Sequence, residues 1–168
     1  MERLWAPWRM EYIRSTVKEP ADTGCVFCAM LNEQDDVKNL ILHRFPRCFL
    51  VLNLYPYTNG HLMVVPLRHT AEFASITPEE HTEMGDVLAL AQKVIAECFT
   101  PHGFNIGMNL GRSAGAGVVG HLHYHIVPRW SGDSNFMSTV GHTRVMSESL
   151  PESYARLKIA IDKQLASA

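Results

Sequence analysis

The sequence lacks any long hydrophobic run, since no stretch of its 168 residues approaches the roughly 18 consecutive apolar residues of a membrane-spanning helix. Residues 1–5 do not begin the continuous apolar segment of a secretion signal. An excess of one charge is also missing, because 15 Lys and Arg stand against 17 Asp and Glu. These absences predict a cytoplasmic protein that neither enters a membrane nor coats nucleic acid.

The sequence has only four cysteines, and their spacing limits the roles they can have. Cys25 and Cys28 form a C-x-x-C pair, for which two interpretations stay open: a redox pair, or half of a metal site. Cys48 and Cys98 lie in apolar stretches, where we expect small buried hydrophobes rather than disulfide partners. This usage agrees with a reducing compartment.

Length and apolar content predict one domain. The chain is 46% hydrophobic, which is enough for a sizeable core, and it has no internal repeat. Residues 1–24 carry Trp5, Trp8 and many charges, and they read as an N-terminal extension. Residues 25–168 read as a single domain with a C-terminal tail.

The pattern of apolar residues predicts an α+β fold. Four segments are apolar or alternating and are expected to be strands: 47–54, 61–66, 104–110 and 121–128. A short connection joins the first two, so they should pair antiparallel. One long helix is expected between Thr77, which forms a capping-box pattern with Glu80, and Pro101. A weaker helical pattern at 152–166 predicts a C-terminal helix beside this mostly antiparallel sheet.

Histidine is what the sequence has in excess, with nine residues, three of which alternate as His121, His123 and His125. On a strand, alternate side chains project from one face about 6.6–6.8 Å apart. The three imidazoles should therefore form a row that can bind a metal, stabilise an anion or supply a nucleophile. The alternative is that the row has no chemical function and is a solvent-exposed polar face that happens to be rich in histidine.

The segment before this row favours a phosphate site. Asn109 is followed by the glycine-rich loop 111–117, in which Arg112 adds a positive charge. Small residues expose backbone N–H groups that can cradle phosphate oxygens, although a simple hairpin connection looks similar. A neutral imidazole nitrogen can attack phosphorus and form a covalent intermediate. Together these features predict nucleophilic chemistry on a phosphate.

The histidine row, with apolar residues between its members, resembles the defining motif of the histidine-triad nucleotide hydrolases and transferases. The likeness covers about residues 25–135 and includes Asn53, 60–66 and 127–129. Two flanking segments resemble a bacterial branch related to diadenosine tetraphosphate phosphorylases, namely 4–9 and 130–137.

The resemblance implies a role for each matching residue. His123 would attack the α-phosphorus and form a nucleotidyl-histidine, while His125 would stabilise phosphate oxygens. His121 completes the triad, and His61 would support it from the second strand. The implied nucleotide-binding residues are Asn53 at the ribose, Asn109 near the phosphates, and Gly111, Ser113 and Gly117 in the loop. The family usually has Gln or Ser just before the triad, where this chain has residues 115–120 without either.

The resemblance also implies a metal. Some relatives and the related uridylyltransferases bind zinc through a C-x-x-C pair, a downstream histidine and the first triad histidine. The corresponding residues here are Cys25, Cys28, His69 and His121, with His43 as a substitute for His69. Two thiolates and two imidazoles make a closed, structural zinc site. The alternative is an open catalytic zinc held by the three triad histidines.

The predicted function is nucleotidyl transfer from a dinucleoside polyphosphate or a nucleoside phosphoramidate, with water or inorganic phosphate as acceptor. The resemblance implies a homodimer. A nucleotide- or zinc-binding regulatory module without turnover is the alternative, and the intact His123 argues against it. Four histidines need no catalytic explanation: His43, His81, His102 and His142.

Overall fold

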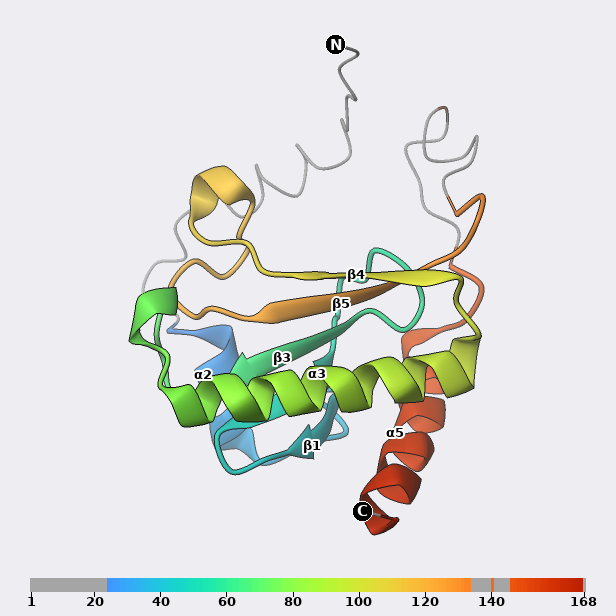
Figure 1. Cartoon of the computed structure of the whole chain (residues 1–168), viewed down its shortest axis with the longest axis horizontal. Helices are drawn as coiled ribbons and strands as arrows, with labels where there is room; N and C mark the ends of the chain where they lie inside the picture. Colours follow the sequence, from blue (N-terminus) through green and yellow to red (C-terminus); the bar gives the residue numbers. More distant parts are fainter. Residues whose placement is uncertain (1–23, 134–139, 141–145, 168) are drawn as a thin grey trace.

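The computed structural model describes residues 24–133, 140 and 146–167, and within these the predicted α+β class is confirmed. Its sheet has the order β1-β2-β3-β5-β4, with every neighbouring pair antiparallel (Figure 1). The strands are β1 (Ile41–Arg44), β2 (Cys48–Leu52), β3 (Leu62–Pro66), β4 (Gly103–Gly107) and β5 (Tyr124–Arg129). The helices are α2 (Val26–Glu33), α3 (Pro78–Phe99) and α5 (Leu150–Ala166), with short 3₁₀ turns η1 (Phe73–Ser75) and η2 (Arg112–Ala114).

Apart from Gly24, the predicted extension 1–24 lies outside the described residues, as does His142, so the boundary at residue 25 stays a prediction. No helix among the described residues is long and apolar enough to cross a membrane.

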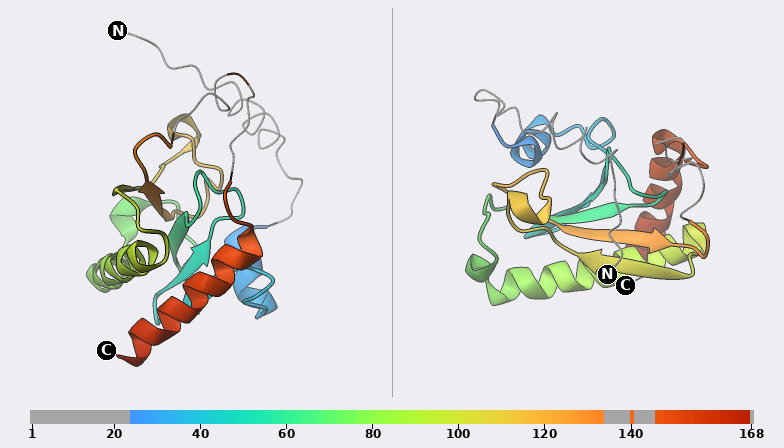
Figure 2. Two further views of the ribbon diagram at one scale, coloured as in Figure 1. Left: turned by 90° about the vertical axis from the view of Figure 1, so that its right-hand side faces the viewer. Right: turned by 90° about the horizontal axis from the view of Figure 1, so that it is seen from above.

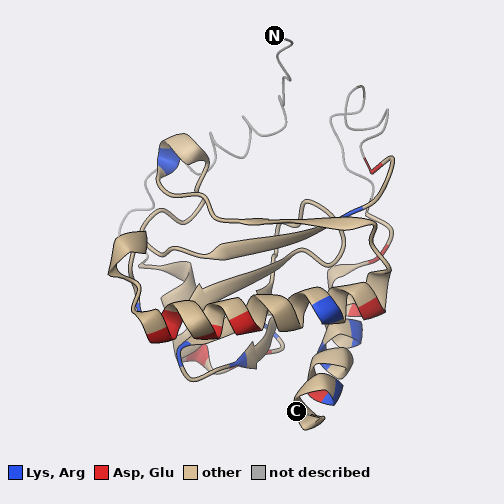
Figure 3. Cartoon of the chain, viewed as in Figure 1, with Lys and Arg blue, Asp and Glu red and all other residues tan. Residues whose placement is uncertain are grey.

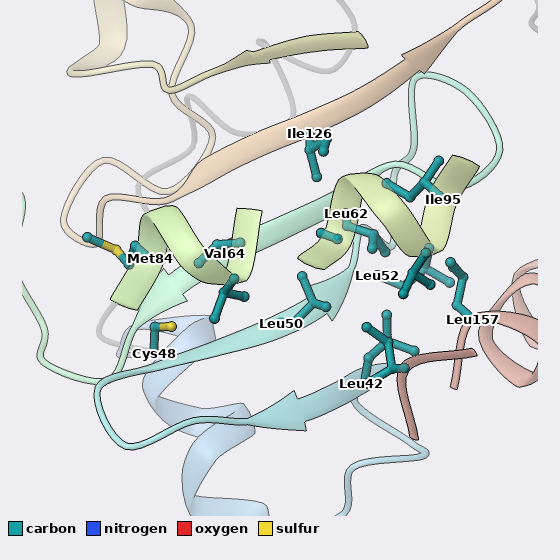
Figure 4. Close-up of a cluster of buried hydrophobic side chains, with 14 of the residues drawn as sticks. Leu42, Cys48, Leu50, Leu52, Leu62, Val64, Met84, Ile95, Ile126 and Leu157 are labelled. Carbon is teal, nitrogen blue, oxygen red and sulfur yellow. The ribbon is translucent and has the colours of Figure 1, made fainter. Parts of the chain in front are cut away.

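The two faces of the sheet are covered by different helices. In the right-hand view of Figure 2, α3 lies on one side of the strands and α2 on the other. Because strand side chains alternate, each buried strand contributes residues to two hydrophobic cores, one on each face of the sheet. The α3 core includes Leu50, Leu52, Leu62, Val64 and Ile126, which Figure 4 labels around the cut helix. The α2 core consists of Phe27, Ile41, Phe49, Val51, Met63 and Val65.

The long helix begins where its capping box predicts. The Thr77 hydroxyl accepts from the Glu80 N–H at 3.2 Å, and Glu80 Oε2 accepts from the Thr77 N–H at 2.9 Å. α5 begins at Leu150, two residues earlier than predicted, because Ser149 and Glu152 form a second capping box. Figure 3 shows the charged residues spread along α3 and α5, and Lys163 joins them through an ion pair with Glu97 at 2.7 Å.

Two predicted strand ends are wrong by three residues each, and two elements were not predicted. β5 begins at Tyr124 rather than His121, because the Leu122 N–H donates to the Thr70 carbonyl at 2.8 Å, beyond the end of β3. β4 ends at Gly107 rather than at residue 110, since its ladder with β5 stops opposite His125. The β1 strand and the α2 helix were not predicted, because four and eight residues are too few to establish a period.

Candidate active site and metal site

The three histidines of the motif gather on the α2 face of the sheet, although only His125 lies in a strand. His125 pairs with Met63 of β3, and its ring lies 4.7 Å from the His123 ring, centroid to centroid. Phe27 of α2 packs its ring 5.5 Å from His121 and 5.1 Å from His123. The alternation therefore brings the row together despite the later start of β5.

His123 has one nitrogen occupied and one available. Its Nδ1 lies 3.0 Å from the His121 carbonyl oxygen, so Nδ1 carries the proton and donates. The lone pair is then on Nε2. The side chain is only 4% exposed, and this burial lowers the pKa of His123 below its ordinary value. His123 is thus a neutral imidazole with a fixed tautomer at neutral pH.

His61 and His125 form a directed chain of hydrogen bonds. The Tyr57 N–H donates to His61 Nδ1 at 3.1 Å, which leaves the proton of His61 on Nε2. That Nε2 lies 3.0 Å from His125 Nδ1 and donates to it. The proton of neutral His125 is therefore on Nε2, which makes this atom a hydrogen-bond donor beside the His123 ring.

Burial and the neighbouring His123 lower the pKa of His125 to about 4. At neutral pH the residue is uncharged. It can therefore polarise a phosphate oxygen through a hydrogen bond, but it does not bring a permanent positive charge to the site.

A cleft of about 340 Å³ opens beside His125, within the size range of small-molecule sites. It is lined by Tyr57, Thr58, Asn105, Ile106, Gly107, Met108, Asn109, His125, Val127 and Arg129. The predicted nucleotide-binding residues are therefore divided. Asn109 lines this cleft, whereas Gly111, Ser113 and Gly117 are exposed and are not part of its lining.

Asn53, the predicted ribose-binding residue, lies beside His61. Its Oδ1 accepts from the Tyr55 N–H at 2.9 Å, and its Nδ2 is 3.4 Å from His61 Nδ1. The turn after β2 therefore holds the Asn53 amide next to the histidine chain.

The metal-ligand set comes together as the resemblance implied. Cys25 caps α2 and Cys28 lies in its first turn. His121 Nδ1 is 3.3 Å from Cys25 Sγ and 3.7 Å from Cys28 Sγ, and His69 Nδ1 is 3.5 Å from Cys28 Sγ. All four ligand atoms lie within 4.8 Å of one another. His43 is not in this cluster and packs against Phe45.

These distances fit a zinc ion. Tetrahedral zinc bonds of about 2.3 Å to sulfur and 2.0 Å to nitrogen place the ligand atoms about 3.3–3.8 Å apart. His121 Nε2 donates to the Pro66 carbonyl at 2.8 Å, so its Nδ1 lone pair points toward the thiols. Burial raises the pKa of the Cys28 thiol, and a cation would offset this by favouring the thiolate. Of the three triad histidines, the cluster includes His121 alone.

A family model described as the HIT domain matches residues 34–132, more than half of the chain. The chain belongs to the HIT family. Over 154 residues this HIT protein is 40% identical to the AP-4-A phosphorylase of Mycobacterium tuberculosis, a match covering 89% of this chain and 79% of that protein. It is also 33% identical over 97 residues to the asymmetrical bis(5'-nucleosyl)-tetraphosphatase of Schizosaccharomyces pombe, covering 58% of this chain and 53% of that protein.

Solved structures of HIT proteins have the same fold. A Zn-bound histidine triad family protein from Mycobacterium smegmatis superimposes with a TM-score of 0.69 at 28% identity, covering 86% of this chain and 98% of that one. The predicted family and HIT-like fold are therefore confirmed.

Sequence reasoning missed Tyr57. Its ring lies 4.6 Å from the His61 ring and 6.1 Å from the His125 ring, and its N–H sets the tautomer of the chain. The sequence signal that could have indicated Tyr57 is its position in a short turn just before His61.

The low pKa of His125 predicts a pH dependence of stability. An unfolded histidine titrates near 6.5, so between about pH 6.5 and pH 4 the unfolded chain binds a proton that folded His125 does not. This group therefore lowers the free energy of unfolding as the pH falls through that window, by at most about 2 kcal/mol between pH 7 and pH 5. Chemical denaturation at both pH values should show a smaller difference in His125→Asn. An unchanged difference would contradict the assignment.

Proposed function

We propose that this HIT protein transfers a nucleotidyl group from a dinucleoside polyphosphate, such as diadenosine tetraphosphate, through a covalent intermediate on His123. One observation carries the proposal: His123 holds a neutral imidazole with its lone pair on Nε2, and the neutral donor His125 lies beside it. The 40% identity to an AP-4-A phosphorylase supports the choice of substrate.

The chemistry divides into two displacements. First, His123 Nε2 bonds to the α-phosphorus, and the bond from that phosphorus to the bridging oxygen breaks, releasing a nucleoside polyphosphate with the electron pair. An oxygen of the acceptor then attacks the same phosphorus and returns the electron pair to Nε2. With phosphate as acceptor, diadenosine tetraphosphate gives ATP and ADP. With water it gives ATP and AMP.

The residues around His123 support these steps. The His121 carbonyl holds Nδ1–H and so orients the nucleophile. His125 Nε2–H would bind an oxygen of the α-phosphate, and His61 keeps that donor in its tautomer. Asn53 would bind the ribose, and Asn109 would contact the phosphates from the cleft. Backbone N–H groups of the loop with Gly111, Ser113 and Gly117 would add donors when nucleotide is bound.

Zinc held by Cys25, Cys28, His69 and His121 would act as a structural tie between α2 and the segment leading into β5. It takes no part in the displacement. None of the four cysteines forms a disulfide, which fits a reducing, cytoplasmic setting.

The experiment that tests the function is incubation with diadenosine tetraphosphate, with and without inorganic phosphate. ATP and ADP formed only with phosphate identify a phosphorylase, and ATP and AMP without phosphate identify a hydrolase. Cleavage of a nucleoside phosphoramidate alone would narrow the substrate to that class. If none of these is cleaved, the protein is instead a binding module without turnover.

The sheet edge supports a homodimer, which forms part of the proposal. Among the described strands β4 lies at the edge of the sheet, and Ile106 on it is 50% exposed. An exposed, apolar edge strand is a template for pairing with a second copy. Light scattering should give the mass of two chains for the native protein and of one chain for Ile106→Lys. A native protein of single-chain mass would contradict the dimer.

A further inference from the structure

A second polar cluster lies at the Arg129 end of the cleft. Arg129 donates from Nε and Nη2 to the two carboxylate oxygens of Asp133, at 2.5 Å and 2.8 Å. It also donates from Nη1 to the Asn105 side-chain oxygen at 2.8 Å. The proposed two-step mechanism uses none of these residues.

Arg129 lies on the same strand face as His125, which belongs to the reacting centre. Arg129 and His125 lie four residues apart on β5, so both side chains project from the same face, about 13 Å apart along the strand. Both line the same cleft. Asn105, which binds the guanidinium, lies opposite Val127, so this contact holds the Arg129 head group on the His125 side.

The guanidinium keeps hydrogen-bonding capacity. Arginine has five N–H donors, and among the described residues three of them are engaged by Asp133 and Asn105. One N–H remains on each terminal nitrogen, and the side chain is 44% exposed. Two neighbouring N–H groups on a planar fork suit the oxygens of a phosphate.

The partners of Arg129 make this fork rigid. Asp133 is only 12% exposed in its side chain, and it also accepts from the Trp130 N–H at 3.3 Å. The carboxylate and the Asn105 amide therefore fix the plane of the guanidinium before a ligand arrives. Such preorganisation lowers the entropy that binding costs.

We propose that Arg129 binds a phosphate group beyond the α-phosphate and so selects substrates with a phosphate chain. The proposal rests on the proposed function, because that function places the α-phosphate at His123 and His125. The shared chemistry is a phosphate oxyanion next to the reacting phosphorus. It can come from the polyphosphate chain of the substrate or from free phosphate as the acceptor.

The first test is direct binding, which needs no turnover. Calorimetry measures the affinities of ATP and AMP for the native protein, Arg129→Ala, Arg129→Lys and the control Arg47→Ala. Arg47 matches Arg129 in exposure, at 48%, and lies outside the cleft. We expect the ratio of ATP to AMP affinity to fall about tenfold in Arg129→Ala and less in Arg129→Lys, with no change in Arg47→Ala.

A merely structural role for the Arg129–Asp133 pair gives a different result. Loss of an ion pair that only closes the turn after β5 would weaken ATP and AMP equally, leaving their ratio unchanged, and this outcome would overturn the proposal. It would not affect the proposed function, which the cleavage assay on the native protein decides separately.

Kinetics with diadenosine tetraphosphate separate the two sources of phosphate. In Arg129→Ala, a higher KM for the dinucleotide at saturating phosphate assigns Arg129 to the substrate chain. A higher KM for phosphate at saturating dinucleotide assigns it to the acceptor. Native values of both KM would overturn the proposal, as would an unchanged ratio of ATP to AMP affinity.

Discussion

Replacement of His123 by alanine is expected to lower kcat for diadenosine tetraphosphate by at least about 10³-fold. The reason is chemical: Nε2 of His123 is the atom that bonds to phosphorus, and the neighbouring donor His125 has no lone pair there in its neutral tautomer. Steady-state product formation by chromatography measures the effect. Activity near that of the native protein would show that His123 is not the nucleophile.

Two variants separate chemistry from folding. His123→Gln retains an N–H that can reach the His121 carbonyl and fills more of the buried site than alanine, so it should fold like the native protein and stay inactive. His81→Ala removes an exposed histidine from α3, outside the cleft, and should retain native kcat. Both His123 variants should still bind AMP.

Loss of the metal is the second large effect expected. Cys25→Ser removes one of the four ligands, and we expect about one zinc per chain in the native protein and little in the variant. Because the ligands join α2 to the segment before β5, the variant should unfold roughly 10 °C lower. Metal analysis by mass spectrometry, together with thermal unfolding, measures both.

A matched control uses another cysteine. Cys98 is a free, partly buried thiol at the end of α3 and lies outside the ligand cluster. Cys98→Ser should therefore retain zinc. The site would be refuted if the native protein contained no zinc and a chelator left its unfolding temperature unchanged.

Local signals predicted much of the fold. Thr77 and Glu80 mark the start of α3 to the residue, because a capping box depends only on nearby groups. Alternation placed Leu122 and Ile126 in the α3 core and the histidines on the other face, where His121 and His123 pack against Phe27. The start of β5 depended on the distant Thr70 carbonyl, which no local pattern reports.

The candidate site likewise has a part that the sequence predicted and a part that depends on tertiary contacts. His121, His123 and His125 were found because they lie in one motif, and the metal ligands because a resemblance joined distant residues. The Tyr57–His61–His125 chain and the Arg129 cluster depend on which strands are neighbours. Arg129 meets Asn105 only because β4 pairs with β5, and that pairing is a tertiary contact.

The most direct test of covalent catalysis by His123 is the stereochemistry at the reacting phosphorus. A substrate with a chiral thiophosphate at the α-position reports the number of displacements, since each in-line attack inverts the configuration. Two displacements through His123 predict retained configuration, read in the nucleoside α-thiodiphosphate when phosphate is the acceptor and in isotope-labelled nucleoside thiophosphate when oxygen-labelled water is the acceptor. Inverted configuration would mean that the acceptor attacks the substrate directly and would contradict the nucleotidyl-histidine.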